Sequence, residues 1–559
     1  SKLNFMDEIT FRTLDFQYIL DRIEIMTPYG HIYKDKMRAF IEGEEEELKK
    51  ELDEVERFKN LVKDEKFTRG IRDLLINIKD LRNSIRRAQR GGVLTDVELF
   101  ELKNFFMSIR RLKNILDEKE KEIAIDYNIE PLEELEALLD PENTSLPTFY
   151  IYDAYSEELK NIRQEVKCLQ SEIDKKRDTL KKKVEEELNL RITIDGTAVV
   201  AKDKKDLVEK LKDYPYLVYL GENYMTIKYA LKPTDEIDIL NKKIQILKGK
   251  EEKEEEHIRE KLSSEIKKQA KRIWKNIAGI GRLDLVIGKA DLALKINGIK
   301  PNITYDHVLI IKNGRHPKVE VLLRAKSFQF KPISVQLKRG VTCITGANMG
   351  GKTVSLKLIG LLTAMAQHGL LVPAEEMTLG LNNFIRTSIE DSQSIDRGLS
   401  AFGGEIRAVK QAIDLSDNRG LILIDELAKG TNPEEGYAIS KAIVEYLLEK
   451  ESITVVTTHY DNVANTEGVL HLQVVGLSNA DFEELENKII HSHEDPIEII
   501  NSYMDYGLIQ VDRNAQVPKD AINIARIMGL DLNIIELAEK NLKGKAGYIG
   551  KARIRSKAY

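Results

Sequence analysis

The stretch Gly346, Ala347, Asn348, Met349, Gly350, Gly351, Lys352 and Thr353 reads GANMGGKT. It fits the pattern G-x4-G-K-T, in which a glycine-rich loop surrounds phosphate groups. Residues 341–345 before it form a short β-prone run, and residues 354–367 after it are apolar and compatible with a helix. Because such a loop joins a strand to a helix, these flanks give the motif the context that it requires.

Each part of this loop has an expected role toward ATP and Mg²⁺. The glycines lack a Cβ, so backbone N–H groups can turn inward around a polyphosphate. The N-terminus of the following helix adds a favourable dipole for the same anion. Lys352 is expected to reach the β- and γ-phosphates, and the hydroxyl of Thr353 is expected to bind Mg²⁺.

Two further β-prone runs end in polar residues that suit ATP hydrolysis. Residues 421–424 are apolar and lead into Asp425 and Glu426. We expect Asp425 to orient the Mg²⁺ through water and Glu426 to position or deprotonate the attacking water. Residues 453–457 lead into Thr458 and His459, and we expect the imidazole of His459 to sense the γ-phosphate. An acidic pair or a histidine at a strand end can also be purely structural.

Composition narrows the class of protein. The chain has 559 residues, 42% hydrophobic and 32% charged, with a formal net charge of −6. This charge argues against a nucleic-acid binder that works by bulk electrostatics, although local patches remain compatible with it. Cys168 and Cys343 fit no metal or disulfide framework, which favours a reducing compartment. The sequence contains no recognisable signal peptide or membrane-spanning run, so we predict a cytoplasmic location without a membrane partner.

The pattern along the chain predicts a multidomain α and α/β protein. Residues 1–155 are expected to form a helical core domain, ending in an ordered connector at 140–155. Two charged helices with apolar seams, residues 156–188 and 237–274, predict an antiparallel coiled-coil arm across residues 156–280. The alternative is two unrelated surface helices. Residues 281–545 are expected to form a P-loop α/β ATPase domain, and residues 546–559 a basic tail.

Between the two helices, residues 190–235 predict a small mixed domain at the tip of the arm. Its β-prone pieces are residues 192–194, 216–220 and 225–229. The tip holds eight Lys or Arg and seven Asp or Glu, a net charge of +1. A domain that grips a duplex should neutralise several phosphates, and this balance leaves little surplus charge for that. The charge alone therefore predicts a poor DNA clamp.

The downstream motifs resemble the MutS family of ABC-type ATPases. They are SIEDSQSIDRGLSAFGGEI at residues 388–406, LILIDELAKGTNPEEG at 421–436 and TTHY at 457–460. The chain has Ala347 where the family loop usually has Pro, and Ala401 where the family has Thr between Ser400 and Phe402. Both changes are mild.

The resemblance implies an ATP hydrolase that works as a homodimer or a MutS-like heterodimer. Ser400 would reach the γ-phosphate bound by the other subunit. Phe328 would stack on the adenine, and His491 would be a second contact to the base. Residues 505–542 resemble the helical element through which the family dimerises.

The departures from the family leave the client open. The chain shows no N-terminal mismatch-reading domain and no C-terminal nuclease domain, so we expect a short MutS-like form. The first hypothesis is a clamp that acts on mispaired or branched DNA. The second is a chaperone-like reactivase ATPase for a cobalamin-dependent lysine or ornithine aminomutase, a group that the connector at residues 147–153 resembles. A structural arm protein with inert sites is a third.

Overall fold

The computed structural model describes residues 4–346, 351–389, 399–512 and 520–556. The predicted loop residues Ala347, Asn348, Met349 and Gly350 lie outside this part of the chain. The described residues form a mixture of helical and α/β structure with three sheets, in agreement with the predicted multidomain α and α/β class. They divide into two compact units, one of residues 1–76, 115–127 and 280–559, the other of residues 77–114 and 128–279. The predicted division at 155 and 280 stays a prediction.

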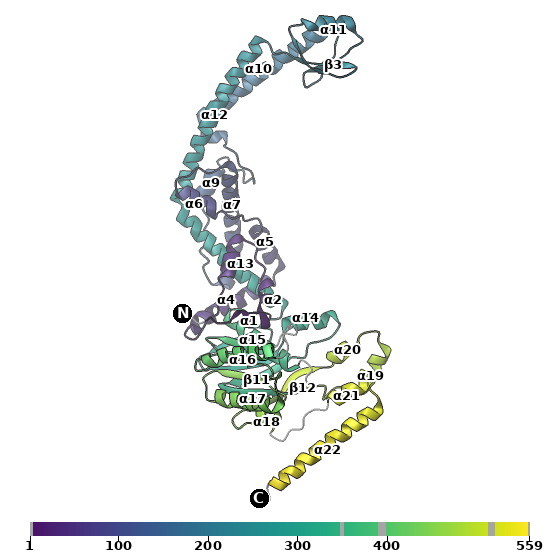
Figure 1. Cartoon of the computed structure of the whole chain (residues 1–559). Helices are drawn as coiled ribbons and strands as arrows, with labels where there is room; N and C mark the ends of the chain where they lie inside the picture. Colours follow the sequence, from purple (N-terminus) through teal and green to yellow (C-terminus); the bar gives the residue numbers. More distant parts are fainter. Residues whose placement is uncertain (1–3, 347–350, 390–398, 513–519, 557–559) are drawn as a thin grey trace. The chain divides into compact units, whose positions relative to one another are not determined.

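A six-stranded sheet organises the first unit (Figure 1). Its order is β13–β12–β7–β11–β10–β9, with all neighbours parallel except β12 and β13. The strands are β7 (Gly340–Thr345), β9 (Ile385–Ser388), β10 (Leu421–Ile424), β11 (Ile453–Thr457), β12 (Leu470–Gly476) and β13 (Asp505–Gln510). The runs predicted at 341–345, 421–424 and 453–457 are β7, β10 and β11. Every residue of these three strands is buried, which explains why they read as continuous rather than alternating apolar runs.

Helices cover both faces of this sheet. On one face a single hydrophobic core joins the strands to α16 (Leu399–Leu415), α17 (Pro433–Leu448) and α18 (Asp461–Ala464). On the other face lies α15 (Gly351–Gln367), the helix that follows the predicted phosphate loop. A Cβ on its Gly360 would lie 2.5 Å from the side chain of Leu14 and 2.7 Å from that of Leu423. The glycine therefore lets α15 pack closely between β10 and the N-terminal helices.

The remaining elements of this unit flank the sheet. The N-terminal helices are α1 (Glu8–Thr13), α2 (Phe16–Asp21), α3 (Pro28–Asp35), α4 (Glu45–Val62) and α5 (Glu65–Leu75), joined by α8 (Glu120–Ile123). A four-stranded sheet of order β4–β8–β5–β6 contains β4 (Asn302–Thr304), β5 (Val308–Gly314), β6 (Ile333–Lys338) and β8 (Glu376–Gly380), with α14 (Pro317–Ala325) after β5. The C-terminal helices are α19 (Phe482–His491), α20 (Pro496–Ser502), α21 (Asp520–Ile527) and α22 (Leu532–Ser556).

Two long helices dominate the second unit. They are α10 (Glu157–Leu188) and α12 (Asp235–Lys268), which pack against each other. Lys176 of α10 pairs with Glu236, whereas Arg163 pairs with Glu251 and Glu255, so the two helices run antiparallel. The helix predicted over 237–274 is wrong in one respect. It ends at Lys268, and a separate helix, α13 (Ala270–Lys295), follows.

The tip between these helices is a three-stranded antiparallel sheet of order β1–β3–β2 with one short helix. Its elements are β1 (Thr197–Ala201), α11 (Lys205–Lys212), β2 (Leu217–Glu222) and β3 (Thr226–Leu231). The prediction of a strand at 192–194 is wrong, because the hydroxyl of Thr193 bonds to Asp195 and to Thr197 and closes a turn. Gly196, with a φ of +80°, completes that turn before β1 begins.

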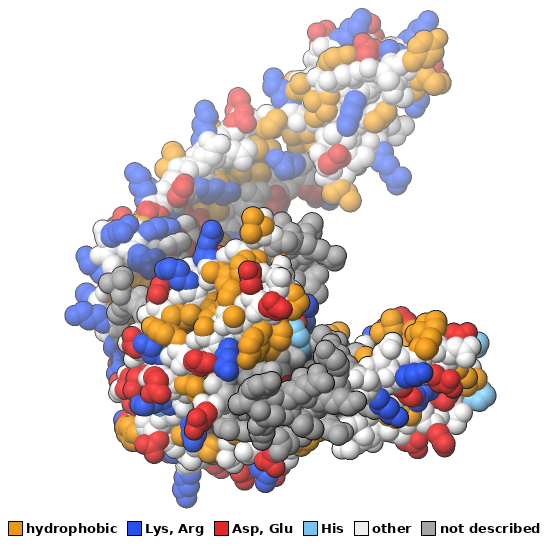
Figure 2. All heavy atoms as spheres, turned by 60° about the horizontal axis from the view of Figure 1, so that its bottom comes forward, with side chains coloured by type: hydrophobic (Ala, Val, Ile, Leu, Met, Phe, Trp, Pro, Cys, Tyr) orange, Lys and Arg blue, Asp and Glu red, His pale blue; other side chains and the backbone are white. Residues whose placement is uncertain are grey.

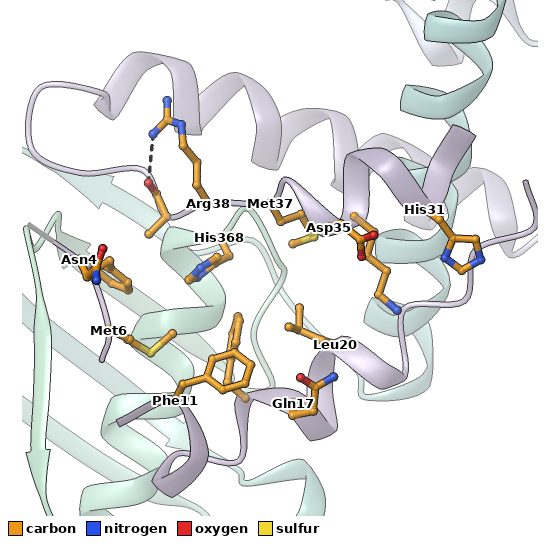
Figure 3. Close-up of a pocket in the computed structure, with 14 residues that line it drawn as sticks. Asn4, Met6, Phe11, Gln17, Leu20, His31, Asp35, Met37, Arg38 and His368 are labelled. Atoms are coloured by element: carbon orange, nitrogen blue, oxygen red, sulfur yellow. Dashed lines mark hydrogen bonds between the residues drawn. The ribbon is translucent and has the colours of Figure 1, made fainter. Parts of the chain in front are cut away.

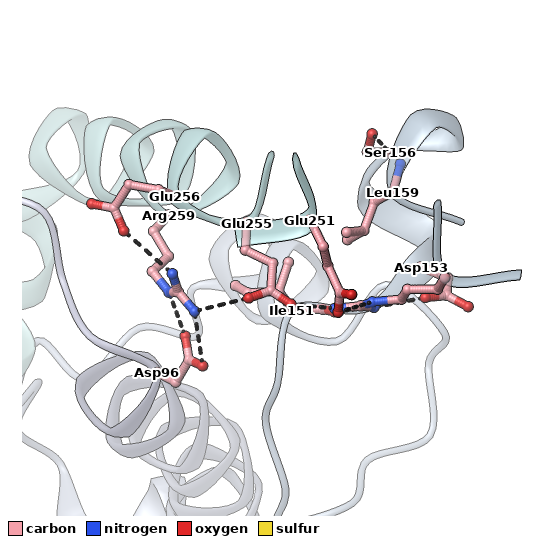
Figure 4. A network of polar contacts seen from close by, with 10 residues as sticks. Asp96, Ile151, Asp153, Ser156, Leu159, Glu251, Glu255, Glu256 and Arg259 are labelled. Carbon is pink, nitrogen blue, oxygen red and sulfur yellow. Dashed lines mark hydrogen bonds and ion pairs between the residues drawn. The ribbon is translucent and has the colours of Figure 1, made fainter. Parts of the chain in front are cut away.

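Ion pairs fix the base of the two long helices (Figure 4). The guanidinium of Arg163 contacts Asp153, Glu251 and Glu255 at 2.6 to 3.3 Å. Arg259 pairs with Asp96 at 2.7 Å and also lies 3.5 Å from Glu255. Glu255 thus links two arginines on different helices, so α10, α12 and α7 (Asp96–Glu118) share one network.

The connector at residues 140–155 is built around a buried lysine of α7. The ammonium of Lys103, whose side chain is fully buried, lies 3.6 Å from Asp140 and donates to the carbonyl of Thr148 at 2.8 Å. Asp140 also accepts N–H bonds from Thr144 and Ser145. Other helices of this unit are α6 (Arg82–Gln89), α9 (Glu133–Leu139) and the 3₁₀ turn η1 (Asp153–Tyr155). Among the described helices, none is long and apolar enough to cross a membrane.

Candidate nucleotide site

The predicted ATP-site residues are carried by neighbouring parallel strands. β11 lies between β7 and β10, and all three run in the same direction. Their carboxyl ends therefore meet at one edge of the sheet, where ligands bind in open α/β folds. β7 leads to the predicted phosphate loop, β10 to Asp425 and Glu426, and β11 to Thr458 and His459.

Two contacts join Lys352 and Thr353 to the acidic pair. The Nζ atom of Lys352 lies 2.9 Å from Oε1 of Glu426, with both side chains largely buried. The hydroxyl of Thr353 donates to Oδ2 of Asp425 at 2.8 Å. The fold thus brings Lys352 into contact with Glu426, 74 positions away in the sequence, and Thr353 into contact with a residue 72 positions away. The expected cation, hydroxyl and carboxylates form one cluster.

Thr457, the last residue of β11, holds the acidic pair in place. Its hydroxyl donates to Oδ1 of Asp425 at 2.5 Å and accepts the N–H of Glu426 at 2.9 Å. Burial raises the pKa of Glu426, but the hydrogen bond and charge of Lys352, with Lys429, outweigh burial and leave the pKa below its ordinary value. The Glu426 carboxylate is therefore ionised at neutral pH.

The start of the phosphate loop is also anchored. Gly346 has a φ of +143°, and a Cβ there would lie 3.2 Å from Val474 of β12. Just before it, the hydroxyl of Thr345 lies 2.6 Å from Nε2 of His471, whose Nδ1 lies 3.1 Å from the Asn465 side-chain oxygen. Sequence reasoning missed Thr457 and His471. Two signals in the sequence marked Thr457: it ends the β-prone run 453–457, and it is the first residue of the TTHY motif.

A hollow beside this cluster contains Phe328. It has a volume of about 250 Å³ and is lined by Val319, Leu322, Leu323, Lys326, Phe328, Val354, Glu498, Asn501 and Tyr506. Val354 directly follows Thr353, so the hollow begins where the phosphate loop ends. Its aromatic and aliphatic walls with a few polar groups suit a nucleotide base. His491 lies in a different hollow along α19, with Asp481, Glu484 and Lys488.

The two remaining predicted residues are exposed. His459 packs its ring against Tyr460, with ring centres 4.1 Å apart. Ser400 lies in the first turn of α16 and is exposed to solvent. Residues 390–398, which precede it, lie outside the described part of the chain. An exposed Ser400 is compatible with contact to a second subunit, which stays a prediction.

The cluster has the donor set of a nucleotide-bound metal. Among the described residues, no group of three or more His, Cys, Asp or Glu side chains could hold a metal ion alone. Mg²⁺ at nucleotide sites takes one or two protein oxygens, with phosphate oxygens and waters completing an octahedron. The oxygens of Thr353 and Asp425, 2.8 Å apart, fit that requirement.

Comparison with known proteins connects this geometry to a family. Residues 342–533 match the family model of MutS domain V. That range includes Lys352, Asp425, Glu426, Ser400 and His491, and it begins after Phe328. This match and the relatives described below support a relationship between this chain and the MutS family.

Proteins called endonuclease MutS2 are similar over a longer range. The protein of Halothermothrix orenii is 29% identical over 482 residues, 82% of this chain and 58% of the relative. That of Caldanaerobacter subterraneus subsp. tengcongensis is 28% identical over 89% of this chain and 60% of the relative. The protein of Ruminiclostridium cellulolyticum is 30% identical over 86% of this chain and 59% of the relative. The chain thus spans about 60% of the length of these MutS2 relatives, and the similarity extends well beyond the MutS domain V region.

Proposed function

We propose that the chain is a MutS-like ATPase that works as an ATP-dependent dimeric clamp on mispaired or branched DNA. The observation that carries the ATPase part is the cluster of Lys352, Thr353, Asp425 and Glu426 at the carboxyl edge of the parallel sheet. The DNA part is supported by the similarity to the MutS family and to MutS2 proteins.

The residues of the cluster divide the work of ATP hydrolysis. Lys352 exchanges its contact with Glu426 for the β- and γ-phosphates and neutralises charge there. Thr353 and Asp425 would hold Mg²⁺, which supplies electrostatic stabilisation of the phosphates. The ionised Glu426 orients the attacking water and accepts its proton, and Thr457 keeps that carboxylate in place. Phe328 and the hollow beside Val354 hold the base.

Dimerisation would complete the site and pair the arms. Ser400 in the exposed first turn of α16 would supply a hydroxyl to the nucleotide of the other subunit. Helix α22 and the turn between α21 and α22 support self-association because they expose large apolar side chains, at Met528, Leu530, Leu532, Ile534, Leu537 and Leu542. Such apolar surface is typical of a protein–protein contact. In this proposal, the arm formed by α10 and α12 carries the tip toward DNA.

The clamp is tested by measuring how DNA affinity depends on salt concentration and on the structure of the DNA. Phosphate contacts release counterions, so six to ten contacts lower affinity by roughly 10³–10⁵ between 50 and 200 mM salt. Plain, mismatched and branched duplexes should be compared with the full chain, with a chain lacking residues 543–559, and with one lacking the tip, residues 191–233. The clamp predicts preference for one DNA structure that survives loss of the tail and disappears with the tip. Weak binding, equal for all three duplexes and lost with the tail, would contradict it.

A protein client is the second candidate, favoured by the surface of the tip. Six large apolar side chains there are more than half exposed: Ile194, Val199, Tyr219, Leu220, Tyr224 and Met225. In Figure 2 the tip carries such side chains next to charges of both signs. Lys202 and Lys212 of the tip are paired with Glu222 and Glu209, which further reduces the free positive charge available for phosphates. An apolar surface with balanced charge fits a protein better than a polyanion.

Reactivation of a purified cobalamin-dependent aminomutase tests this alternative. The substrate-inactivated lysine or ornithine enzyme would be incubated with free adenosylcobalamin, ATP and the chain. Recovery of mutase activity that fails with Glu426→Gln and with Tyr224→Ser would support the protein client. Lack of recovery with the unaltered chain would reject this client.

A further inference from the structure

The N-terminal segment, residues 4–10, lies along the outer edge of the six-stranded sheet. Met6 forms a parallel bridge with Ile385 of β9, and the N–H of Ile385 donates to the carbonyl of Phe5 at 2.7 Å. β9 is the last strand in the order of the sheet. The segment thus pairs with a strand edge that would otherwise be free.

Two side chains fasten this segment to β9. The guanidinium of Arg386 donates to the carbonyls of Asn4 and Phe5 at 2.8 and 2.9 Å. The fully buried hydroxyl of Thr10 accepts the N–H of Thr387 at 3.1 Å and its hydroxyl at 3.2 Å. Buried hydrogen bonds of this kind are specific, because each broken one leaves a polar group unsatisfied.

The other side of the segment faces a cavity (Figure 3), and on that side Phe5 makes an edge-on ring contact with His368, with ring centres 5.7 Å apart. The cavity has a volume of about 540 Å³ and lies between the segment, α2, α3 and the region just after α15, where His368 lies. Asn4 and Met6 line it, opposite Leu20 and Met37. Because packing from that side is incomplete, the bonds to β9 determine where the segment lies.

β9 in turn leads to the nucleotide site. Its last residue, Ser388, is in register with Ile424 of β10. The carbonyl of Ser388 accepts the N–H of Asp425 at 2.8 Å. A displacement of β9 would therefore move the backbone of Asp425, whose carboxylate contacts both Thr353 and Thr457.

We infer that Thr10 and Arg386 are positioning residues for the nucleotide site. They hold β9 between the N-terminal segment and β10, and through the carbonyl of Ser388 they set the position of Asp425. The inference rests on the proposed function, because it assigns these residues an effect on the Mg²⁺ side of the site. It gives residues 4–10, far from the motifs, a part in ATP hydrolysis.

The test removes the hydroxyl of Thr10 and measures nucleotide binding with and without Mg²⁺. The affinity of Thr10→Val for a fluorescent ATP analogue should equal that of the unaltered chain in EDTA. In Mg²⁺ its affinity should fall about three- to tenfold, the expected effect of one lost buried hydrogen bond. The Mg²⁺ concentration for half-maximal turnover should rise by a similar factor. Thr10→Ser, which keeps the hydroxyl, should restore both values.

Two further variants separate positioning from general damage. Thr68→Val removes a hydroxyl that is partly buried and bonds to the carbonyl of Val62 at 2.9 Å, and it should change neither value. Arg386→Met should reproduce Thr10→Val, and it replaces that variant if Thr10→Val fails to fold, as judged by thermal unfolding. Equal loss of affinity in EDTA and Mg²⁺, or no loss in either variant, would overturn the inference. Absence of ATP binding by the unaltered chain would overturn the proposed function, and with it this inference.

Discussion

Glu426 combines an unusual backbone conformation with an expected catalytic role. Its φ of +42° lies in the left-handed region, which costs a residue with a Cβ about 1–3 kcal/mol unless its surroundings enforce it. Its N–H donates to both the hydroxyl and the carbonyl of Thr457, at 2.9 and 3.1 Å, and its carboxylate meets Lys352. Three contacts thus hold a strained residue at the point where the proposed mechanism needs a base.

The hollow next to Val354 makes Phe328 the stronger of the two predicted base contacts. Phe328→Ala should weaken ATP affinity by about 1–3 kcal/mol, the usual value of aromatic stacking on a base. His491→Ala serves as the matched comparison, because His491 lines a different hollow and should change affinity less. Calorimetric titration of both variants measures this. A larger loss with His491→Ala would place the base elsewhere.

His368 predicts a stability that falls on acidification. Its ring packs against Phe16 and its Nδ1 contacts the carbonyl of Ala364 at 2.6 Å, and burial lowers its pKa to about 4. Between that value and an unfolded pKa of about 6.5, the unfolded chain binds the proton more readily, so stability is lost as the pH falls. In His368→Gln, which keeps a donor but does not titrate, the loss between pH 7 and 5 should be about 1–2 kcal/mol smaller. Thermal unfolding across this range measures it, and an unchanged pH dependence would contradict the assignment.

At the scale of elements, Lys103 should decide whether the connector at residues 140–155 is ordered. Lys103→Met leaves Asp140 buried beside no cation, which should destabilise this unit by about 3–5 kcal/mol. Limited proteolysis should then cut the connector much faster, while Lys167→Met, a change on the exposed face of α10, should leave the rate unchanged. Equal cleavage rates for the two variants would show that the buried ion pair is not what orders the connector.

The sequence predicted elements well where burial was complete. β7, β10 and β11 are buried along their whole length, so apolar runs marked them. The strand predicted at residues 192–194 was wrong because Thr193 forms part of a turn. Its hydroxyl bonds to Asp195 and Thr197, and the pattern of β-prone residues did not indicate this. The break at residue 269 between α12 and α13 was missed because both helices carry apolar residues at helical spacing.

The clustering of the candidate site's motif residues was predictable from the sequence, whereas the residues that support them were not. Lys352, Thr353, Asp425 and Glu426 follow from loop and strand-end patterns. The order of the strands in the sheet is what places Thr457, His471 and residues 4–10 near the site. This order could not be predicted from the sequence, because long connections separate the parallel strands. The hollow that contains Phe328 could not be predicted either, because it forms where α14 and α20 pack near α15.

At the scale of the whole molecule, the proposal requires a dimer. Leu537→Asp places a charge on the exposed apolar surface of α22 and should shift the chain toward monomer, so that turnover per chain falls several-fold and depends on concentration. A mixture of Ser400→Ala and Lys352→Ala chains should retain at most one working site per heterodimer. Analytical ultracentrifugation and turnover over a dilution series measure this. Specific activity that is constant down to monomeric concentrations would contradict a composite site.

The most direct test of the account compares ATP binding and turnover in the unaltered chain, Lys352→Ala and Glu426→Gln. Lys352→Ala should lose measurable ATP binding, because the phosphates lose their cation. Glu426→Gln should bind ATP as well as the unaltered chain and hydrolyse it about 10²-fold or more slowly, because water is no longer activated. Equal ATP affinity in Lys352→Ala and the unaltered chain, or full turnover in Glu426→Gln, would contradict the assignment of this cluster as the ATPase site.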